Sequence, residues 1–334
     1  MIDLHLHLDG SLSVNDCIYL AEQQNIELGK DFPKCLFVLD DCPSLEEYLT
    51  KFELPLKLLQ ERSALKYVAY SLTTRLAKMG YIYAEIRFAP LLHLEHGMSQ
   101  YDATRAALDG VEEALLEYPD FEANLILCCM RHASMELNKE TIEVANQLKG
   151  TRVVAVDLAG AERLHPSSYY KEVFDLAKQY HLNITIHAGE ATGSDEIMMA
   201  IDNGAMRIGH GVHLSLDEES IKRVKDNNIC FEFCPTSNLQ TKSLLKYQDV
   251  PLKKFMDNGI AVTINSDNMT VSNVNAMTEM SEMKDTFNLS LEEVHQLLLN
   301  SINHSFTSQE VKTKLKEKLA SRVSEYYSNL NLLD

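Results

Sequence analysis

The feature that most constrains the fold is a regular alternation of short β-rich runs with longer helical stretches. Eight runs have the composition of buried strands: Ile2–Leu8, Tyr81–Phe88, Ala123–Cys129, Val153–Leu158, Asn183–His187, Arg207–His210, Ile229–Phe233 and Ala261–Asn265. The stretches between them show helical periodicity, as in Ser63–Met79 and Ser215–Asp226. Strands that alternate with helices typically form a parallel sheet, because each helix returns the chain to the same end of the sheet.

The eight runs lie in a chain without an obvious internal boundary. No segment rich in proline, glycine or serine divides the 334 residues, so we expect one domain over residues 1–334. Eight strands in one domain favour an α/β fold closed into a (β/α)8 TIM barrel, with extra helices near the C-terminus. An open doubly wound sheet is the alternative. A Rossmann site in such a sheet would need a GxGxxG pattern after an early strand, and none of Gly10, Gly80 and Gly110 lies in one.

Charge and cysteine content restrict the partners and the compartment. The formal net charge of -18 repels nucleic-acid polymers and anionic membranes, but it does not repel a small neutral molecule. No run is apolar and long enough to span a bilayer. The seven cysteines lack CxxC spacing and indicate free thiols. Because the chain opens without the features of a signal peptide, we expect a cytoplasmic protein.

The first predicted strand places two imidazoles on one face. Between residues 2 and 9 the even positions are aliphatic and the odd positions are polar, so His5 and His7 point to the same side of the strand. Asp9 follows toward its C-terminal end. Two histidines at this spacing can reach one metal ion, although an isolated pair is more often incidental.

Other predicted strands end in matching chemistry. The fifth ends in His187-Ala188-Gly189-Glu190, the sixth ends at His210 between two glycines, and the eighth is followed by Asp267. In a barrel these ends meet at one rim. Imidazoles and carboxylates are ligands for zinc-like divalent ions. We therefore predict a metal site at the rim, formed by His5, His7, His187 and Asp267 with Glu190 and His210 beside it.

The remaining histidines and one cysteine receive structural interpretations. Six histidines in predicted loops or helices are interpreted as surface residues: His93, His96, His165, His181, His295 and His304. His132 and His213 follow predicted strands and could line the rim, but a structural role is favoured. Cys234 has no assigned histidine partner, which predicts a buried, unreactive thiol.

Six motifs, in this order along the chain, resemble those of the adenosine deaminase family. They are His5-Leu6-His7-Leu8-Asp9-Gly10-Ser11, Glu85-Ile86-Arg87-Phe88-Ala89-Pro90, Asp157-Leu158-Ala159-Gly160, His187-Ala188-Gly189-Glu190, Gly209-His210-Gly211 and Cys234-Pro235-Thr236-Ser237-Asn238. The resemblance extends from residue 3 to about residue 273. It implies a (β/α)8 barrel that deaminates adenosine to inosine and ammonia, and by extension 2′-deoxyadenosine to 2′-deoxyinosine and ammonia.

The resemblance also implies a site and a mechanism. One zinc ion, held by His5, His7, His187 and Asp267, would lower the pKa of water so that hydroxide attacks purine C6. Glu190 would protonate N1, while His210 and Asp267 would orient the attacking oxygen and take up its proton. Asp9 would contact the ribose, and the backbone at Gly160 the purine. Residues 44–60, with Tyr48, Leu54 and Leu58, resemble an apolar cover over the pocket.

One position departs from the family pattern. Many members carry two adjacent aspartates after the last strand, whereas Asn268 follows Asp267 here. The second position is expected to bond the purine N7, which is an acceptor, and an amide already supplies a donor N–H. Asn268 is thus compatible with purine binding. It leaves open whether the substrate and the optimal pH match those of relatives with aspartate.

Three alternatives remain open at this point. The chain could deaminate adenine, a modified adenosine or AMP, although Asp9 near the 5′ position would repel a phosphate. It could be a catalytically silent relative that binds nucleosides. The metal cluster alone would also permit hydrolysis of unrelated amides or esters. The sequence indicates neither the oligomeric state nor which divalent ion the protein binds in the cell.

Overall fold

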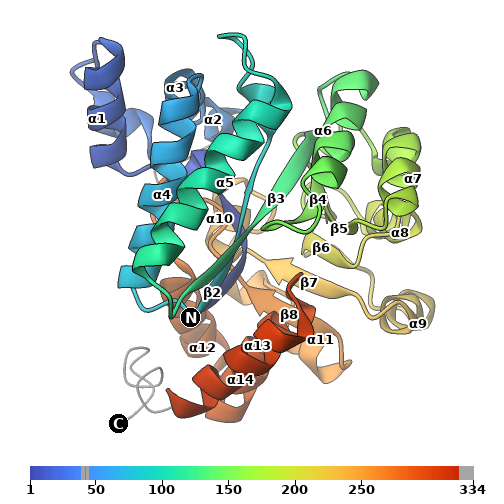
Figure 1. Ribbon diagram of the computed structural model, residues 1–334. Helices are drawn as coiled ribbons and strands as arrows, with labels where there is room; N and C mark the ends of the chain where they lie inside the picture. The colour runs from blue at the N-terminus through green and yellow to red at the C-terminus, as the bar shows by residue number, and fades with distance from the viewer. Residues whose placement is uncertain (39–41, 43–44, 323–334) are drawn as a thin grey trace.

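The computed structural model describes residues 1–38, 42 and 45–322. Eight parallel strands follow one another around a single sheet in the order β1 to β8 (Figure 1). Their bounds are β1 Ile2–His7, β2 Tyr83–Phe88, β3 Glu122–Met130, β4 Val153–Ala159, β5 Asn183–Ala188, β6 Arg207–His210, β7 Cys230–Phe233 and β8 Ala261–Ile264. All eight predicted strands are confirmed, and the differences at their ends are no larger than two residues.

The first and last strands meet at the rim of the barrel. Leu6 pairs in parallel with Asp267, just after β8. The backbone N–H of His7 donates to the carbonyl of Asp267 at 2.7 Å, and the N–H of Asp267 donates to the carbonyl of His5 at 2.8 Å. These bonds join the two edges of the sheet, so the predicted (β/α)8 barrel is confirmed and the open sheet is excluded. They also fix Asp267 beside His5 and His7.

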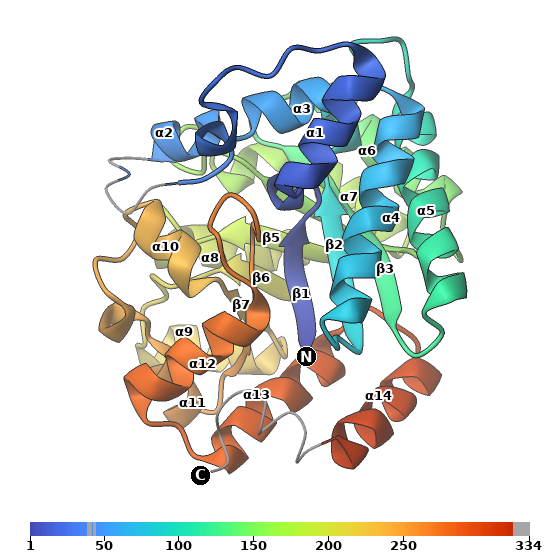
Figure 2. The same cartoon turned by 90° about the vertical axis from the view of Figure 1, so that its left-hand side faces the viewer.

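Helices surround the strands (Figures 1 and 2). Predicted Ser63–Met79 corresponds to α4, whereas predicted Ser215–Asp226 begins three residues later as α9, where the Asp217 side chain caps the first turn. The α-helices are α1 Val14–Gln24, α2 Leu45–Thr50, α3 Glu53–Leu58, α4 Arg62–Lys78, α5 Gln100–Glu117, α6 Met135–Gln147, α7 Lys171–Gln179, α8 Ser194–Asp202, α9 Glu218–Asp226, α10 Pro235–Gln240, α11 Leu252–Asp257, α12 Ala276–Phe287, α13 Leu291–His304 and α14 Gln309–Ser321. Short 3-10 helices lie at Asp9–Ser11, Phe32–Cys35, Pro90–Leu92, Ser167–Tyr170 and Tyr247–Asp249. None of the described helices is long and apolar enough to cross a membrane.

The two faces of β1 show why the chain folds this way. Ile2, Leu4 and Leu6 are fully buried in the main apolar core between strands and helices. Burial of one such side chain contributes about 1.5–3 kcal/mol. The alternate residues His5 and His7 point into the barrel, where they reach side chains of other strands. The strand therefore supplies packing from one face and chemistry from the other.

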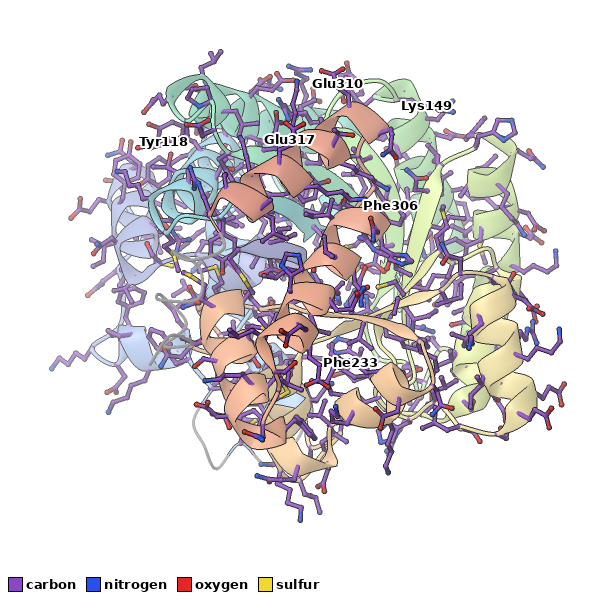
Figure 3. The ribbon with its side chains drawn as sticks, turned by 90° about the horizontal axis from the view of Figure 1, so that it is seen from below. Tyr118, Lys149, Phe233, Phe306, Glu310 and Glu317 are labelled. Carbon is purple, nitrogen blue, oxygen red and sulfur yellow. The ribbon has the colours of Figure 1, made fainter. Side chains whose placement is uncertain are left out.

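Helices α13 and α14 lie across the end of the barrel at which the strands begin (Figures 2 and 3). Phe306, in the turn between these helices, donates its backbone N–H to Glu85 at 2.5 Å. The guanidinium of Arg207 stacks over the Phe306 ring at 3.8 Å. This end is thereby anchored by buried polar contacts, and the predicted functional residues lie at the opposite rim.

Candidate active site

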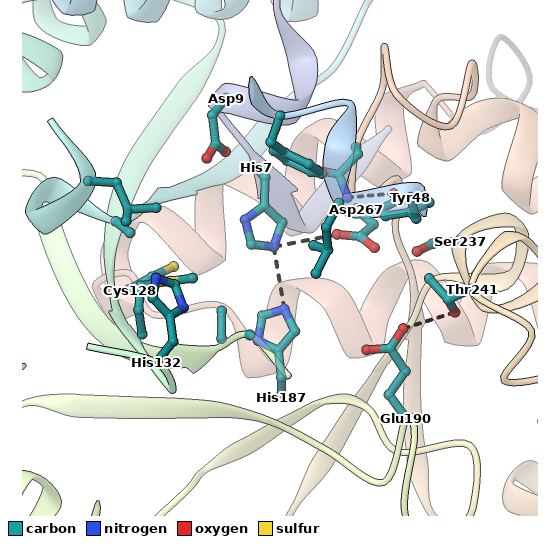
Figure 4. Close-up of a pocket in the computed structure, with 18 of the residues that line it drawn as sticks. His7, Asp9, Tyr48, Cys128, His132, His187, Glu190, Ser237, Thr241 and Asp267 are labelled. Carbon is teal, nitrogen blue, oxygen red and sulfur yellow. Dashed lines mark hydrogen bonds and ion pairs between the residues drawn. The ribbon is translucent and has the colours of Figure 1, made fainter. Parts of the chain in front are cut away.

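A pocket of about 290 Å³ opens at the C-terminal rim, near the lower end of the volumes typical of small-molecule sites (Figure 4). It receives residues from the ends of several strands and from α2, α3 and α10. Every predicted site residue except His5 lines it, namely His7, Asp9, Gly160, His187, Glu190, His210, Asp267 and Asn268. His5 lies just below and is fully buried. The structure therefore brings together residues that are up to 263 positions apart in the sequence.

The four predicted ligand residues gather around His5, which forms one metal-capable group with His7 and His187 and a second with Asp267 and His210. Nε2 of His7 lies 3.4 Å from Nε2 of His187 and 3.4 Å from Oδ1 of Asp267. Nε2 of His5 lies 3.5 Å from the same carboxylate oxygen. Ligand atoms about 2.0–2.1 Å from a tetrahedral zinc ion lie about 3.3 Å apart. The spacing of these side chains therefore fits one such ion.

The hydrogen bonds of the imidazoles support the same conclusion. Nδ1 of His5 contacts Glu232 at 2.8 Å, and Nδ1 of His187 contacts Asp157 at 3.0 Å. Carboxylates accept hydrogen bonds, so these contacts place the ring protons on Nδ1 and leave lone pairs on Nε2. Nε2 of His5 is buried without a hydrogen-bond partner among the described residues. A lone pair that faces the Asp267 carboxylate calls for a cation between them.

Buried charges around His5 favour a positive charge at this point. Burial and the nearby Arg87 both disfavour a charged His5 ring, yet the carboxylates of Asp267 and Glu232 outweigh them and raise its pKa. Burial opposes ionisation of Asp267 too, but the surrounding histidines, His5 foremost, hold its pKa well below the usual range. Burial also keeps the pKa of His7 well below normal, so this ring is neutral at pH 7.

Two buried carboxylates beneath the rim fix the imidazoles. Glu232 of β7 also accepts hydrogen bonds from Arg87 at 2.9 Å and from Arg207 at 2.6 Å. Asp157 of β4 accepts from Arg87 at 2.9 Å. Burial opposes their ionisation, but the neighbouring charges, those of Arg87 and Arg207 on Glu232 and those of His187 and Arg87 on Asp157, lower the pKa of each. The sequence analysis assigned neither carboxylate to the site, although Asp157 begins the motif Asp157-Leu158-Ala159-Gly160.

Glu190 and His210 face each other across the pocket. Oε2 of Glu190 lies 3.7 Å from Nε2 of His210. The hydroxyl of Thr241 donates to Oε1 of Glu190 at 3.1 Å (Figure 4). Burial lowers the pKa of His210, so its ring is neutral at pH 7. The side-chain amide nitrogen of Asn238 lies 3.1 Å from its Nδ1. Thr241 and Asn238 were not predicted as site residues, although Asn238 ends a quoted motif.

Two site residues adopt a backbone conformation that non-glycine residues rarely take. The φ angle is 61° at His210 and 58° at Asp267, in the left-handed region that disfavours side chains. Such strain costs about 1–3 kcal/mol for each residue and concentrates at functional sites. It turns both side chains into the pocket at the ends of their strands.

The predicted substrate contacts lie along the pocket wall. Burial raises the pKa of Asp9 to about 6. Gly160 has a φ of 106°, a conformation that favours glycine, and without a side chain its backbone lies open beside the pocket. Nδ2 of Asn268 donates to the hydroxyl of Tyr48 at 2.8 Å, and its Oδ1 has no hydrogen-bond partner among the described residues. One amide N–H of Asn268 thus remains for a ligand.

The predicted cover is partly confirmed. Ser44 lies outside the described residues, and the stretch from 45 to 60 contains α2 and α3 rather than one helix. Tyr48 lines the pocket as predicted, but Leu54 and Leu58 do not; Leu58 packs into the main core. The apolar lining comes instead from Leu49, Phe52 and Leu56. The break between the two helices changes which side chains face the pocket.

Other interpretations of single residues have mixed outcomes. The prediction that His93 is a surface residue is wrong: its ring is fully buried, lies 3.1 Å from the carbonyl of Leu59, and has a pKa lowered by burial to about 4. The loop after β2 packs against the residues that follow α3: Gln60 donates to the carbonyl of Leu92 at 2.9 Å and accepts from the N–H of Glu95 at 3.0 Å. His132 lines the pocket. Cys234 is buried, and burial raises its pKa well above normal, as expected for an unreactive thiol.

A (β/α)8 barrel with imidazoles and a carboxylate gathered at its C-terminal rim is the architecture of a metal-dependent hydrolase. The model of the adenosine deaminase family matches residues 1–322. The chain is 44% identical over 330 residues to an adenosine deaminase of Haemophilus ducreyi, covering 96% of each protein. It is 43% identical over 320 residues to an adenosine deaminase of Clostridium perfringens, covering 94% of this chain and 96% of the relative. The chain belongs to the adenosine deaminase family and is a hydrolytic deaminase.

Solved structures share this fold. The adenine deaminase of Arthrobacter aurescens is 25% identical, with a TM-score of 0.84 over 97% of this chain and 98% of that one. A zinc-bound amidohydrolase from Burkholderia ambifaria is 19% identical, with a TM-score of 0.87 over 99% of this chain and 92% of that one. The second likeness shows the shared fold.

Proposed function

We propose that this protein removes the 6-amino group of adenosine, and also of 2′-deoxyadenosine, to give inosine or 2′-deoxyinosine and ammonia. The observation that carries this proposal is the grouping of His5, His7 and His187, with the Asp267 carboxylate within 3.5 Å of His5 and His7, next to the Glu190–His210 pair in a pocket with apolar walls. Relatives named adenosine deaminase, 41–44% identical over nearly the whole chain, support the choice of substrate.

We propose one zinc ion per chain, with His5, His7, His187 and Asp267 as its ligands. When bound, zinc would lower the pKa of a water molecule toward about 7 and so supply a nucleophile at neutral pH. The buried carboxylates of Glu232 and Asp157 would keep the imidazoles in the tautomer that presents Nε2. Imidazole and carboxylate donors at this spacing suit zinc well.

The remaining roles follow from where the side chains lie. Glu190 would donate a proton to purine N1, which concentrates the electron deficit at C6. His210 and Asp267 would orient the attacking water and take up its proton. We assign the ribose contact to Asp9, the purine contact to the backbone at Gly160, and the N7 contact to the free amide N–H of Asn268. The apolar side chains of α2 and α3 would exclude bulk water.

We further propose that residues 1–334 act as one domain in the cytoplasm. The partner is a small purine nucleoside. The charge of -18 disfavours nucleic-acid polymers and anionic membranes as ligands.

The test is a comparison of ammonia release from adenosine, 2′-deoxyadenosine, adenine and AMP, with the ultraviolet change of adenosine to inosine followed in parallel. We expect the two nucleosides to be the best substrates and Glu190→Gln to reduce turnover at least about a hundredfold, the range typical of a lost general acid. A strong preference for adenine would contradict the substrate. Undiminished turnover in Glu190→Gln would contradict the role of Glu190.

A further inference from the structure

The turn that carries Glu190 is bound by a carboxylate from the loop after the neighbouring strand β4. Glu162 follows β4 and is 4% exposed. Its Oε1 accepts a hydrogen bond from the backbone N–H of Gly189 at 2.5 Å. Its Oε2 accepts from the N–H groups of Glu190 at 3.2 Å, Ala191 at 2.8 Å and Thr192 at 3.2 Å. One side chain therefore satisfies four consecutive backbone donors.

This turn needs such a partner because of its conformation. Gly189 has a φ of 68°, and the turn leaves β5 before helix α8 begins, so its N–H groups point to one side instead of into a regular element. Buried N–H groups without an acceptor cost about 1–3 kcal/mol each. A charged acceptor forms stronger bonds than a neutral one and suits a concave group of N–H donors.

A second buried side chain fixes the start of the same segment. Arg131, 1% exposed, donates to the carbonyl of His187 at 2.6 Å. Arg131 is also attracted by the carboxylates of Glu162 and Glu196. The segment is thus anchored at the carbonyl of a proposed metal ligand and, two to five residues later, at the amides around Glu190.

We propose that Glu162 is a positioning residue that sets the place of Glu190 in the pocket. The Thr241 hydroxyl orients the end of the Glu190 side chain, whereas Glu162 fixes the backbone from which that side chain extends. A general acid must lie within hydrogen-bond reach of the atom that it protonates, and a displacement of about 1 Å can cost a hundredfold in rate. This inference rests on the role proposed above for Glu190.

The test uses Glu162→Gln in the zinc-loaded, full-length protein. An amide retains the size of the side chain, but its NH2 group meets N–H donors instead of accepting from them. We expect kcat for adenosine to fall about tenfold or more, with a smaller change in KM. The amides of residues 189–192 should exchange hydrogen for deuterium faster than in the unmodified protein. Glu162→Asp keeps the charge but shortens the side chain. Its kcat and its amide exchange should lie between those of the unmodified protein and those of Glu162→Gln.

Glu196→Gln is the matched control. Glu196 is a similarly buried carboxylate that accepts from the backbone N–H of Ser167 at 2.8 Å and, like Glu162, lies near Arg131, at 3.8 Å. In the described part of the chain its carboxylate forms no hydrogen bond with residues 189–192, so this control removes a buried charge near Arg131 without removing those bonds. We expect it to leave kcat and the exchange of those amides near their normal values. An equal fall of kcat in both variants would overturn the proposal, because loss of a nearby buried charge would then explain it.

Glu190→Gln distinguishes a positioning role from a general structural one. If Glu162 acts through Glu190, Glu162→Gln should change the residual rate of the Glu190→Gln protein by less than about twofold, because coupled residues are not additive. The same fold-change in both backgrounds, or unchanged amide exchange in Glu162→Gln, would overturn the proposal. Full turnover in Glu190→Gln would instead refute the role of Glu190. The exchange experiment would then still test whether Glu162 holds the backbone of residues 189–192 in place.

Discussion

Asp157 lies beneath the proposed metal ligands and offers a quantitative test of how the site is built. Its carboxylate contacts Nδ1 of His187 at 3.0 Å and accepts from Arg87 at 2.9 Å and from its neighbour's backbone N–H at 2.7 Å. In Asp157→Asn, the amide oxygen can accept from only some of the three donors, which are His187, Arg87 and the N–H of Leu158. The NH2 group would face one of the remaining donors and could not accept from it. The ring of His187 then loses its fixed orientation.

Two effects of this change can be estimated. Loss of a carboxylate that orients a metal-binding histidine typically lowers metal affinity by about 10–100-fold, which is about 1.4–2.8 kcal/mol. Removal of one partner of a buried ion pair costs about 3–5 kcal/mol of folding stability. We expect about 3 kcal/mol here, because Arg87 keeps its bond to Glu232.

Zinc affinity would be measured by competition with a chelator, and stability by urea unfolding. Asp175→Asn is the control: this carboxylate on α7 pairs at the surface with Lys171 and Lys178 and should change stability by no more than about 1 kcal/mol. Turnover of Asp157→Asn should recover in part at saturating zinc. Unchanged zinc affinity in a folded Asp157→Asn protein would refute the idea that Asp157 orients His187 for a metal ion.

Two further predictions concern the cover and a buried acid. Tyr48→Phe removes the hydroxyl that accepts from Asn268 at 2.8 Å. We expect KM for adenosine to rise about fivefold, equivalent to one hydrogen bond, with little change in kcat. An equal rise of KM in the surface variant Tyr70→Phe would contradict this. Burial raises the pKa of Glu279 from 4.5 to about 8, so the folded protein favours the neutral carboxyl. The free energy of unfolding therefore falls as the pH rises from 4.5 to about 8, by at most about 1.4 kcal/mol per pH unit. Urea unfolding at pH 6 and pH 8 would measure this fall in stability. Glu279→Gln should remove it, and Glu282→Gln at an exposed position should not. The same fall in Glu279→Gln as in the unmodified protein would contradict the prediction.

The sequence predicts the barrel well because its signals are local. Each strand is a short apolar run, and the alternation along residues 2–9 directly places His5 and His7 on one face. Residues at strand ends are predictable too, since a barrel gathers all such ends at one rim. His187 and Asp267 could therefore be assigned to one site before any distance was known.

The supporting contacts could not be predicted, because they depend on the register between strands. His5 and Glu232 are 227 residues apart and meet only once β1 and β7 share the barrel interior. Glu162 follows a strand like many other acidic residues, and nothing local in the sequence indicates that it accepts four N–H groups of another loop. The error at His93 has the same origin, because Leu59 and Gln60, more than 30 residues earlier, bond to a loop that looks exposed in the sequence.

The most direct test of the central claim is a metal titration. The protein would be stripped with a chelator, dialysed, and supplied with zinc in steps while adenosine deamination is followed at each step. We predict no turnover in the stripped protein and a linear rise that saturates at one zinc ion per chain, with His187→Ala failing to recover at that ratio. Full turnover by metal-free protein, or saturation only at several ions per chain, would contradict the account.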